Sequence, residues 1–304
     1  MANGIKCSKK LQMATTVTVC LLLFSVAGYV FIQSTCSNFK YHDEISTTRD
    51  TSYILYGDGL ADKQTTERLH SYIRSVTSRQ TPGGVHLTDT SGRRHFSQIG
   101  QSEFVDELLK GRRNGVFIEC GAFDGETNSN SLFFELHRNW TGVLIEANPI
   151  YHQSVLSKNR NAYVVRACLS TASKPQTVRF KQARLLSGIA TYNKLYNSGG
   201  YNSSPSVEVQ CFPLNAITAA LGIRHVDYFS LDVEGAEMDI LSRIDWTQFS
   251  VDVMTVEYGW QTDILSRLRS LMTANRMFTQ VSLIPVNSTT DSEGVDVVFV
   301  RSTK

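Results

Sequence analysis

Val116–Glu126 has the sequence VFIECGAFDGE, an apolar run that ends in an acid and is followed by Gly121 and Gly125. A second apolar run, Gly142–Glu146, follows about twenty residues later and also ends in an acid. A buried strand, a glycine-containing turn, a helix and a second strand tipped by a carboxylate form half of a nucleotide-binding α/β unit. The glycines let backbone approach a ligand closely, and Glu146 can accept hydrogen bonds from both ribose hydroxyls. The stretch therefore predicts a site for an adenosyl ligand.

Strand and helix patterns alternate along most of the chain. We predict strands at Val116–Cys120, Gly142–Glu146, Ala162–Cys168, Val226–Leu231 and Val251–Glu257. We predict helices at Gln101–Lys110, Ser131–His137, Ile150–Lys158, Leu214–Leu221, Ala236–Ile244 and Thr262–Ala274. Phe278–Ile284 and Val295–Arg301 close the chain as a hairpin-like pair, and Thr177–Lys181 and Ser206–Phe212 are added strands in an insertion at 170–213. Alternation of this kind predicts an α/β fold with a parallel sheet covered by helices on both faces.

Acidic residues lie at the ends of four predicted strands: Glu119, Glu146, Asp232 with Glu234, and Glu257. The carboxyl ends of parallel strands share one edge, so we expect these acids to converge there. The segment Leu231–Glu237, LDVEGAE, has two interpretations. Its acids can cap the next helix, or they can face a ligand or substrate, since three acids are more than capping needs.

The N-terminal region resembles a membrane anchor. Residues 13–33 are apolar and about as long as a bilayer core is thick, and basic residues precede them in residues 1–12. We therefore expect a cytosolic tail at 1–12, a transmembrane helix at 13–33, a lumenal stem at 34–100 with one helix around Thr65–Val76, and a folded domain at 101–304. A cleaved signal peptide is the alternative interpretation.

Composition excludes several classes of protein. The net charge of +2 comes with scattered Lys and Arg, so nucleic-acid binding is not indicated. The sequence has no CxxC, HxxxH or HExxH spacing, so we predict no metal site. It also lacks G-x-G-x-x-G, which disfavours NAD.

Cysteines and glycosylation sequons bear on the compartment. The six cysteines do not form a disulfide scaffold, but Cys168 and Cys211 both end apolar strands, and a bridge between them is left open. Sequons at Asn139, Asn202 and Asn287 agree with lumenal exposure of the domain.

Three motifs in order resemble the FkbM family of S-adenosylmethionine-dependent methyltransferases. They are FIECGAFDG at 117–125, IEANP at 145–149 and LDVEGAE at 231–237. The resemblance implies a Rossmann-like class I methyltransferase fold, with a mostly parallel seven-stranded sheet and a C-terminal antiparallel hairpin. Within the family the chain is similar to the animal Star-like membrane proteins. This similarity implies a type II membrane protein of the endoplasmic reticulum and Golgi that acts in export of client membrane proteins, with the plasma membrane or endosomes as other locations.

The resemblance also implies roles for individual residues. Gly121 and Gly125 would border the methionine part of S-adenosylmethionine, Glu146 would hold the ribose, and Ala167 and Cys168 would lie near the adenine. Glu119, Phe123 and Asp124 belong to the same cofactor-binding loop. Asp232 and Glu234 would face the methyl-transfer cleft, where either carboxylate can act as a general base.

The sequence is compatible with three functions. O-methyl transfer to an acceptor hydroxyl is the first. The second is a non-catalytic module that uses the same fold to escort membrane proteins through the endoplasmic reticulum and Golgi. A Golgi glycosyltransferase is the weakest, because Asp232–Glu234 only approximates the Asp-x-Asp that such enzymes use to bind metal.

Overall fold

The computed structural model describes residues 63–79, 83–192, 204–259, 262–274, 278–284 and 296–302. These residues belong to one compact unit that begins at Ser52. The predicted tail at 1–12 and transmembrane helix at 13–33 lie outside the described residues. Among the helices within the described ranges, none is both long and apolar enough to cross a bilayer.

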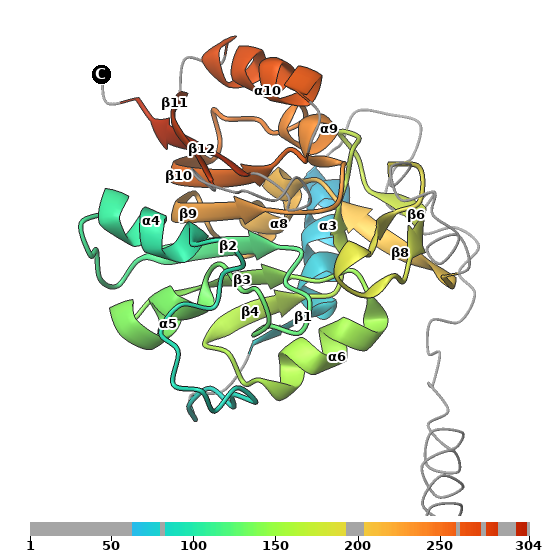
Figure 1. The fold of residues 1–304 in the computed structure, drawn as a ribbon. Coiled ribbons are helices and arrows are strands. Elements are labelled where there is room, and N and C mark those ends of the chain that lie inside the picture. Colours follow the sequence, from blue (N-terminus) through green and yellow to red (C-terminus); the bar gives the residue numbers. More distant parts are fainter. Residues whose placement is uncertain are drawn as a thin grey trace, which may run out of the picture. The chain divides into compact units, whose positions relative to one another are not determined.

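A mixed sheet forms the centre of the fold (Figure 1). Its eight strands are β1 (Thr77–Arg79), β2 (Val116–Cys120), β3 (Thr141–Ile145), β4 (Ala162–Val165), β9 (His225–Leu231), β10 (Ser250–Glu257), β11 (Phe278–Ile284) and β12 (Asp296–Arg301). They are arranged in the order β1-β4-β3-β2-β9-β10-β12-β11. The five from β4 to β10 are parallel, and β1, β12 and β11 are antiparallel to their neighbours.

The predicted parallel strands and C-terminal antiparallel pair are therefore confirmed, whereas the predicted number of seven strands is wrong. The extra strand, β1, lies at the edge of the sheet, where Thr77 pairs with Val165. It follows helix α3 (Lys63–Ser75), whose Leu69 and Ile73 are buried. Residues 63–79, which the sequence placed in the stem, thus belong to the folded unit, which extends upstream of Gln101.

Helices cover both faces of the sheet (Figure 1). Besides α3 they are α4 (Gln101–Leu108), α5 (Leu132–Arg138), α6 (Pro149–Ser157), α8 (Leu214–Ala220), α9 (Glu237–Leu241) and α10 (Thr262–Ala274). Alternate residues of β2 point to opposite faces. Ile118 and Cys120 join the larger hydrophobic core with α3, α8 and α10, whereas Phe117 joins the smaller core with α4 and α5.

A second, smaller sheet lies beside the first and contains the insertion. Its order is β5 (Cys168–Leu169), β8 (Ser206–Phe212), β6 (Gln176–Lys181) and β7 (Gly188–Ile189). The predicted strand Ala162–Cys168 is therefore two strands, because the chain turns after Val165 and β5 pairs with β8 instead. The disulfide Cys168–Cys211, left open by the sequence, is present and joins the two strands at their paired residues.

Candidate functional site

One cavity of about 700 Å³ lies at the carboxyl ends of the parallel strands. Its wall contains eight of the ten residues predicted to bind cofactor or to act in catalysis: Glu119, Gly121, Phe123, Glu146, Ala167, Cys168, Asp232 and Glu234. The other two, Asp124 and Gly125, are absent from the wall. The parallel strands thus bring together, at one edge of the sheet, residues that are more than one hundred positions apart in the sequence.

Gly121 is required by the backbone of the neighbouring strand. Its N–H donates to the Ile145 carbonyl at 3.1 Å, and Asp232 N–H donates to the Cys120 carbonyl at 3.3 Å. Gly121 has φ +85°, and a Cβ at this position would lie 1.9 Å from the Asp232 carbonyl oxygen. The structure thus gives a further reason for this glycine, the close approach of the Asp232 carbonyl, and its place beside the cofactor stays a prediction.

Asp124 and Gly125 build the turn that follows β2. The Asp124 carboxylate accepts hydrogen bonds from Glu126 N–H at 2.9 Å and from Thr127 N–H at 2.7 Å. Gly125 has φ +81° and packs against Val155 of α6. Both residues shape the loop, and neither contributes to the cavity wall.

Glu119 is buried and its carboxylate is satisfied from within the protein. It accepts hydrogen bonds from the Ser129 hydroxyl at 2.9 Å, from Asn130 N–H at 2.7 Å and from the Ser131 hydroxyl. Arg160, which is fully buried, donates to the hydroxyls of both serines. Glu119 therefore fixes the loop to the end of β2 and presents a wall that is already hydrogen bonded.

Glu146 is the acid at the end of β3, and its side chain is 5% exposed. One carboxylate oxygen accepts a hydrogen bond from Phe123 N–H at 2.8 Å, and the other accepts one from Asn148 N–H at 2.7 Å. Burial raises the pKa of Glu146 to about 7. Each oxygen has a second lone pair, so this carboxyl group can also bind a vicinal diol such as that of a ribose.

The cavity has an apolar side next to Glu146. The Phe123 ring lies 4.2 Å from the Tyr151 ring, centroid to centroid. Leu185 and Leu186 extend this wall from the short 3₁₀ helix η1 (Arg184–Leu186). Phe123 was predicted from the sequence, whereas Tyr151, Leu185 and Leu186 were not. The insertion that supplies η1 carries no ligand motif.

Another part of the cavity wall is acidic. Oxygen atoms of Asp232, Glu234 and Glu257 lie within 4.8 Å of one another, and all three residues line the cavity. Glu237 instead folds back and accepts hydrogen bonds from Val233 N–H at 2.8 Å and Gly235 N–H at 2.9 Å. The N-cap of α9 is Ala236 and has no side-chain capping bond, so the interpretation of Asp232 or Glu234 as a helix cap is wrong. Their role toward a ligand stays a prediction. Glu257 was expected at this edge, and its place in the wall adds it to the candidate site.

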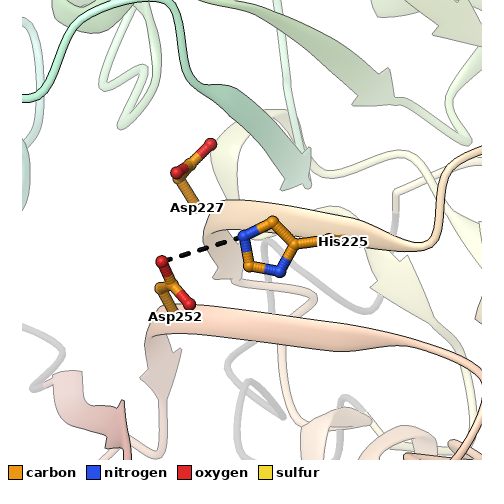
Figure 2. A group of neighbouring side chains, drawn as sticks. All are labelled: His225, Asp227 and Asp252. Carbon is orange, nitrogen blue, oxygen red and sulfur yellow. Dashed lines mark ion pairs between the residues drawn. The ribbon is translucent and has the colours of Figure 1, made fainter.

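A second group of titratable residues, His225, Asp227 and Asp252, lies at the amino ends of β9 and β10 (Figure 2). Arg112 forms ion pairs with both aspartates, at 2.6 Å in the case of Asp252. Val116 N–H also donates to Asp227 at 2.7 Å. This group therefore ties the starts of the strands together at the end of the sheet away from the cavity, and Arg112 supplies the positive charge.

The family described as the methyltransferase FkbM domain matches residues 119–277, just over half of the sequence. The chain belongs to the FkbM methyltransferase family. This membership supports S-adenosylmethionine as the cofactor, as expected from the sequence. No curated protein matches the chain.

Several solved structures resemble this FkbM domain. The FkbM methyltransferase from Methylobacillus flagellatus KT is 12% identical with a TM-score of 0.42, and the match covers 67% of this chain and 48% of that one. Precorrin-6y C5,15-methyltransferase from Geobacter metallireducens GS-15 is 13% identical with a TM-score of 0.37, covering 66% of this chain and 87% of that one. A TehB-like S-adenosylmethionine-dependent methyltransferase from Corynebacterium glutamicum is 10% identical with a TM-score of 0.38, covering 79% and 100%.

The contact at Gly121 leads to a stability prediction. Gly121→Ala should lower the free energy of unfolding by at least about 3 kcal/mol, because either β2 or β9 must move away from the new Cβ. Gly222→Ala is the matched control, since Gly222 has φ +71° but open space around it, and it should cost only about 1 kcal/mol. Urea unfolding of the full-length protein measures both values. Equal losses for the two variants would contradict the proposed clash.

The environment of Glu146 predicts a specific pH dependence. Its pKa of about 7 exceeds the ordinary value of 4.5, so the native state holds the proton more tightly and loses stability as the pH rises from about 4.5 to about 7. Glu146→Gln cannot ionise, so its stability relative to wild type should be higher at about pH 8 than at about pH 5, by roughly 1–3 kcal/mol. Urea unfolding at the two pH values measures this difference. Burial lowers the pKa of His152 to about 4, so this residue makes the native state more stable as the pH rises. It does so equally in wild type and Glu146→Gln, so the difference between the two proteins is unaffected.

Proposed function

We propose that this FkbM domain transfers a methyl group from S-adenosylmethionine to an acceptor hydroxyl. The supporting observation is that one cavity brings together the buried Glu146 carboxyl, an apolar side and an acidic side. Its volume of about 700 Å³ is within the usual range for small-molecule sites. Fold and family alone do not specify a reaction, so the residues of the cavity carry the argument.

The chemistry of the cavity wall suggests one orientation for the cofactor. The adenosyl group fits the apolar side, where Phe123, Tyr151 and Leu186 offer ring and alkyl surface and Glu146 can accept from the ribose hydroxyls. The acidic side, with Asp232, then faces the methionine end. When bound, S-adenosylmethionine supplies an electrophilic methyl group on a positively charged sulfur.

The residues of the chain would then act mainly by positioning. Alignment of two reactants can supply about 7–11 kcal/mol of the barrier. Asp232 lines the acidic part of the cavity. With the cofactor in this orientation, its carboxylate can take the proton of an acceptor hydroxyl, an effect of about 10²–10⁴-fold. Glu234 lies beside it and is the second candidate for this role.

Cofactor binding tests the proposal directly. Isothermal titration of the full-length protein in detergent with S-adenosylmethionine should give a dissociation constant in the micromolar range. Glu146→Ala should weaken binding at least about tenfold, because the ribose hydroxyls lose a buried acceptor. Glu107→Gln, at an exposed position of α4, is the control and should bind as wild type does. Absent or millimolar binding by wild type would contradict the proposal. It would favour the alternative function, the escort of client membrane proteins, which the similarity to Star-like proteins implies.

We also propose that the domain faces the lumen of the endoplasmic reticulum and Golgi, held by a transmembrane helix at 13–33. Its support is the Cys168–Cys211 disulfide, which is typical of an oxidising compartment. The sequon at Asn139 is at an exposed helix end. The protein made in animal cells should therefore lose apparent mass on glycosidase treatment, and Asn139→Gln should lose part of that shift. A mass unaffected by glycosidase in the wild-type protein would contradict lumenal exposure.

A further inference from the structure

The carboxyl groups of Asp232 and Glu257 form an unusual pair on the acidic side of the cavity. Asp232 follows β9 directly, and Glu257 is the last residue of β10. The two strands are adjacent and parallel, with Leu231 opposite Val256, so the next residue of each strand is brought side by side. Oxygen atoms of the two carboxyl groups lie within 4.8 Å of one another, so the groups interact directly. Two ionised carboxylates this close would repel one another, and a hydrogen bond between them forms only when one of them carries a proton.

The negative charges of neighbouring acids favour retention of a proton by the pair. Within the described part of the chain, the groups that face it are acids from four elements: Glu119 at the end of β2, Glu234 in the loop after β9, Glu237 of α9 and Asp296 of β12. Gln101 of α4 donates to Asp296 at 3.0 Å. Arg269 of α10 acts on Tyr258, the residue after Glu257.

The surroundings of the two groups favour Glu257 as the one that carries the proton. The negative charge of Asp232, together with burial, raises the pKa of Glu257 well above its ordinary value. Burial also raises the pKa of Asp232, but the hydrogen bond from Glu257 acts in the opposite direction and lowers it. Two carboxyl groups that share a site in this way titrate as a pair, with one proton retained over a wide pH range.

We propose that Glu257 is a positioning residue whose proton, donated to Asp232, keeps the Asp232 carboxylate ionised and fixed at the cavity wall. Without that donor, a buried Asp232 among four further acids would take up a proton of its own. The pair thus presents a single negative charge to the cavity, and the charged groups found to face it among the described residues are acids. In that state Asp232 can accept the proton of an acceptor hydroxyl and can attract a positively charged sulfur.

This inference rests on the proposed function, and the difference between two ligands tests it without a known acceptor. S-adenosylmethionine carries a positive sulfonium, whereas S-adenosylhomocysteine lacks the methyl group and that charge. An ionised Asp232 should therefore favour S-adenosylmethionine, by about tenfold for a charge pair inside a protein. Calorimetric titration of the full-length protein with each ligand, from about pH 6 to about pH 9, gives this preference as a pH profile.

Two substitutions of Glu257 should separate positioning from simple structural support. Glu257→Gln keeps an N–H donor toward Asp232 and should retain the wild-type preference near neutral pH. Glu257→Ala removes the donor, so the preference should disappear near neutral pH and return only at higher pH, where Asp232 ionises alone. Glu107→Gln should have the wild-type profile. Identical profiles for wild type and Glu257→Ala, with S-adenosylmethionine still bound, would overturn the role of Glu257 and leave the proposed function intact.

A spectroscopic titration decides the same question if Glu257→Ala does not fold or neither ligand binds. In the ligand-free wild-type protein labelled with ¹³C at the side-chain carboxyl carbons, the signals of Asp232 and Glu257 should titrate in two separate steps, with Glu257 protonated to the higher pH. Loss of those steps in Asp232→Asn and Glu257→Gln assigns the signals. Ionisation of both groups together near their ordinary pKa values would overturn the inference.

Discussion

The ends of β2 and β9 can lie side by side only because residue 121 has no side chain. The Asp232 carbonyl occupies the space that a Cβ at Gly121 would need. This contact fixes the distance between the turn whose Phe123 N–H donates to Glu146 and the loop that carries Asp232 and Glu234. Gly121 also has a positive φ, which glycine adopts without strain, and this backbone conformation directs the chain into the turn. The two halves of the cavity wall are thus joined through backbone, so their spacing does not depend on flexible side chains.

The site also shows how several acids can be buried together, because other groups of the described residues donate hydrogen bonds to them. Glu146 and Glu237 each accept hydrogen bonds from two backbone N–H groups. Glu119 is held by two serines and a backbone N–H. The carboxyl groups of Asp232 and Glu257 instead interact with each other, and both line the cavity. Hydrogen bonds from the protein thus stabilise Glu119, Glu146 and Glu237. The interacting pair, Asp232 and Glu257, lines the cavity and can contact a ligand.

Much of the fold could be predicted from the sequence because its signals are local. Each parallel strand is a short apolar run that ends at a charged or glycine residue, so the boundaries of β2 and β9 differ little from those expected. The strand β1 could not be found this way. It has three polar residues, and only its pairing with β4 makes it a strand.

The candidate site was predictable where residues come directly after strands, as Glu146 and Asp232 do. It was not predictable where tertiary packing decides. The apolar wall contributed by η1 depends on how the insertion folds back over the cavity, and no motif encodes that. Asp124 and Gly125 have the expected sequence pattern, but the turn they form directs them away from the cavity. Sequence spacing identified the loop and could not tell which of its members would face inward.

The place of α3 and β1 determines where a stable fragment of this protein can begin. A fragment starting at Gln101, or at Glu119 where the family match starts, would lack both elements. The edge of β4 would then expose unpaired backbone groups, which invite association with other chains. The hydrophobic surface that Leu69 and Ile73 cover would also face water. Expression of the folded unit alone should therefore begin upstream of Lys63.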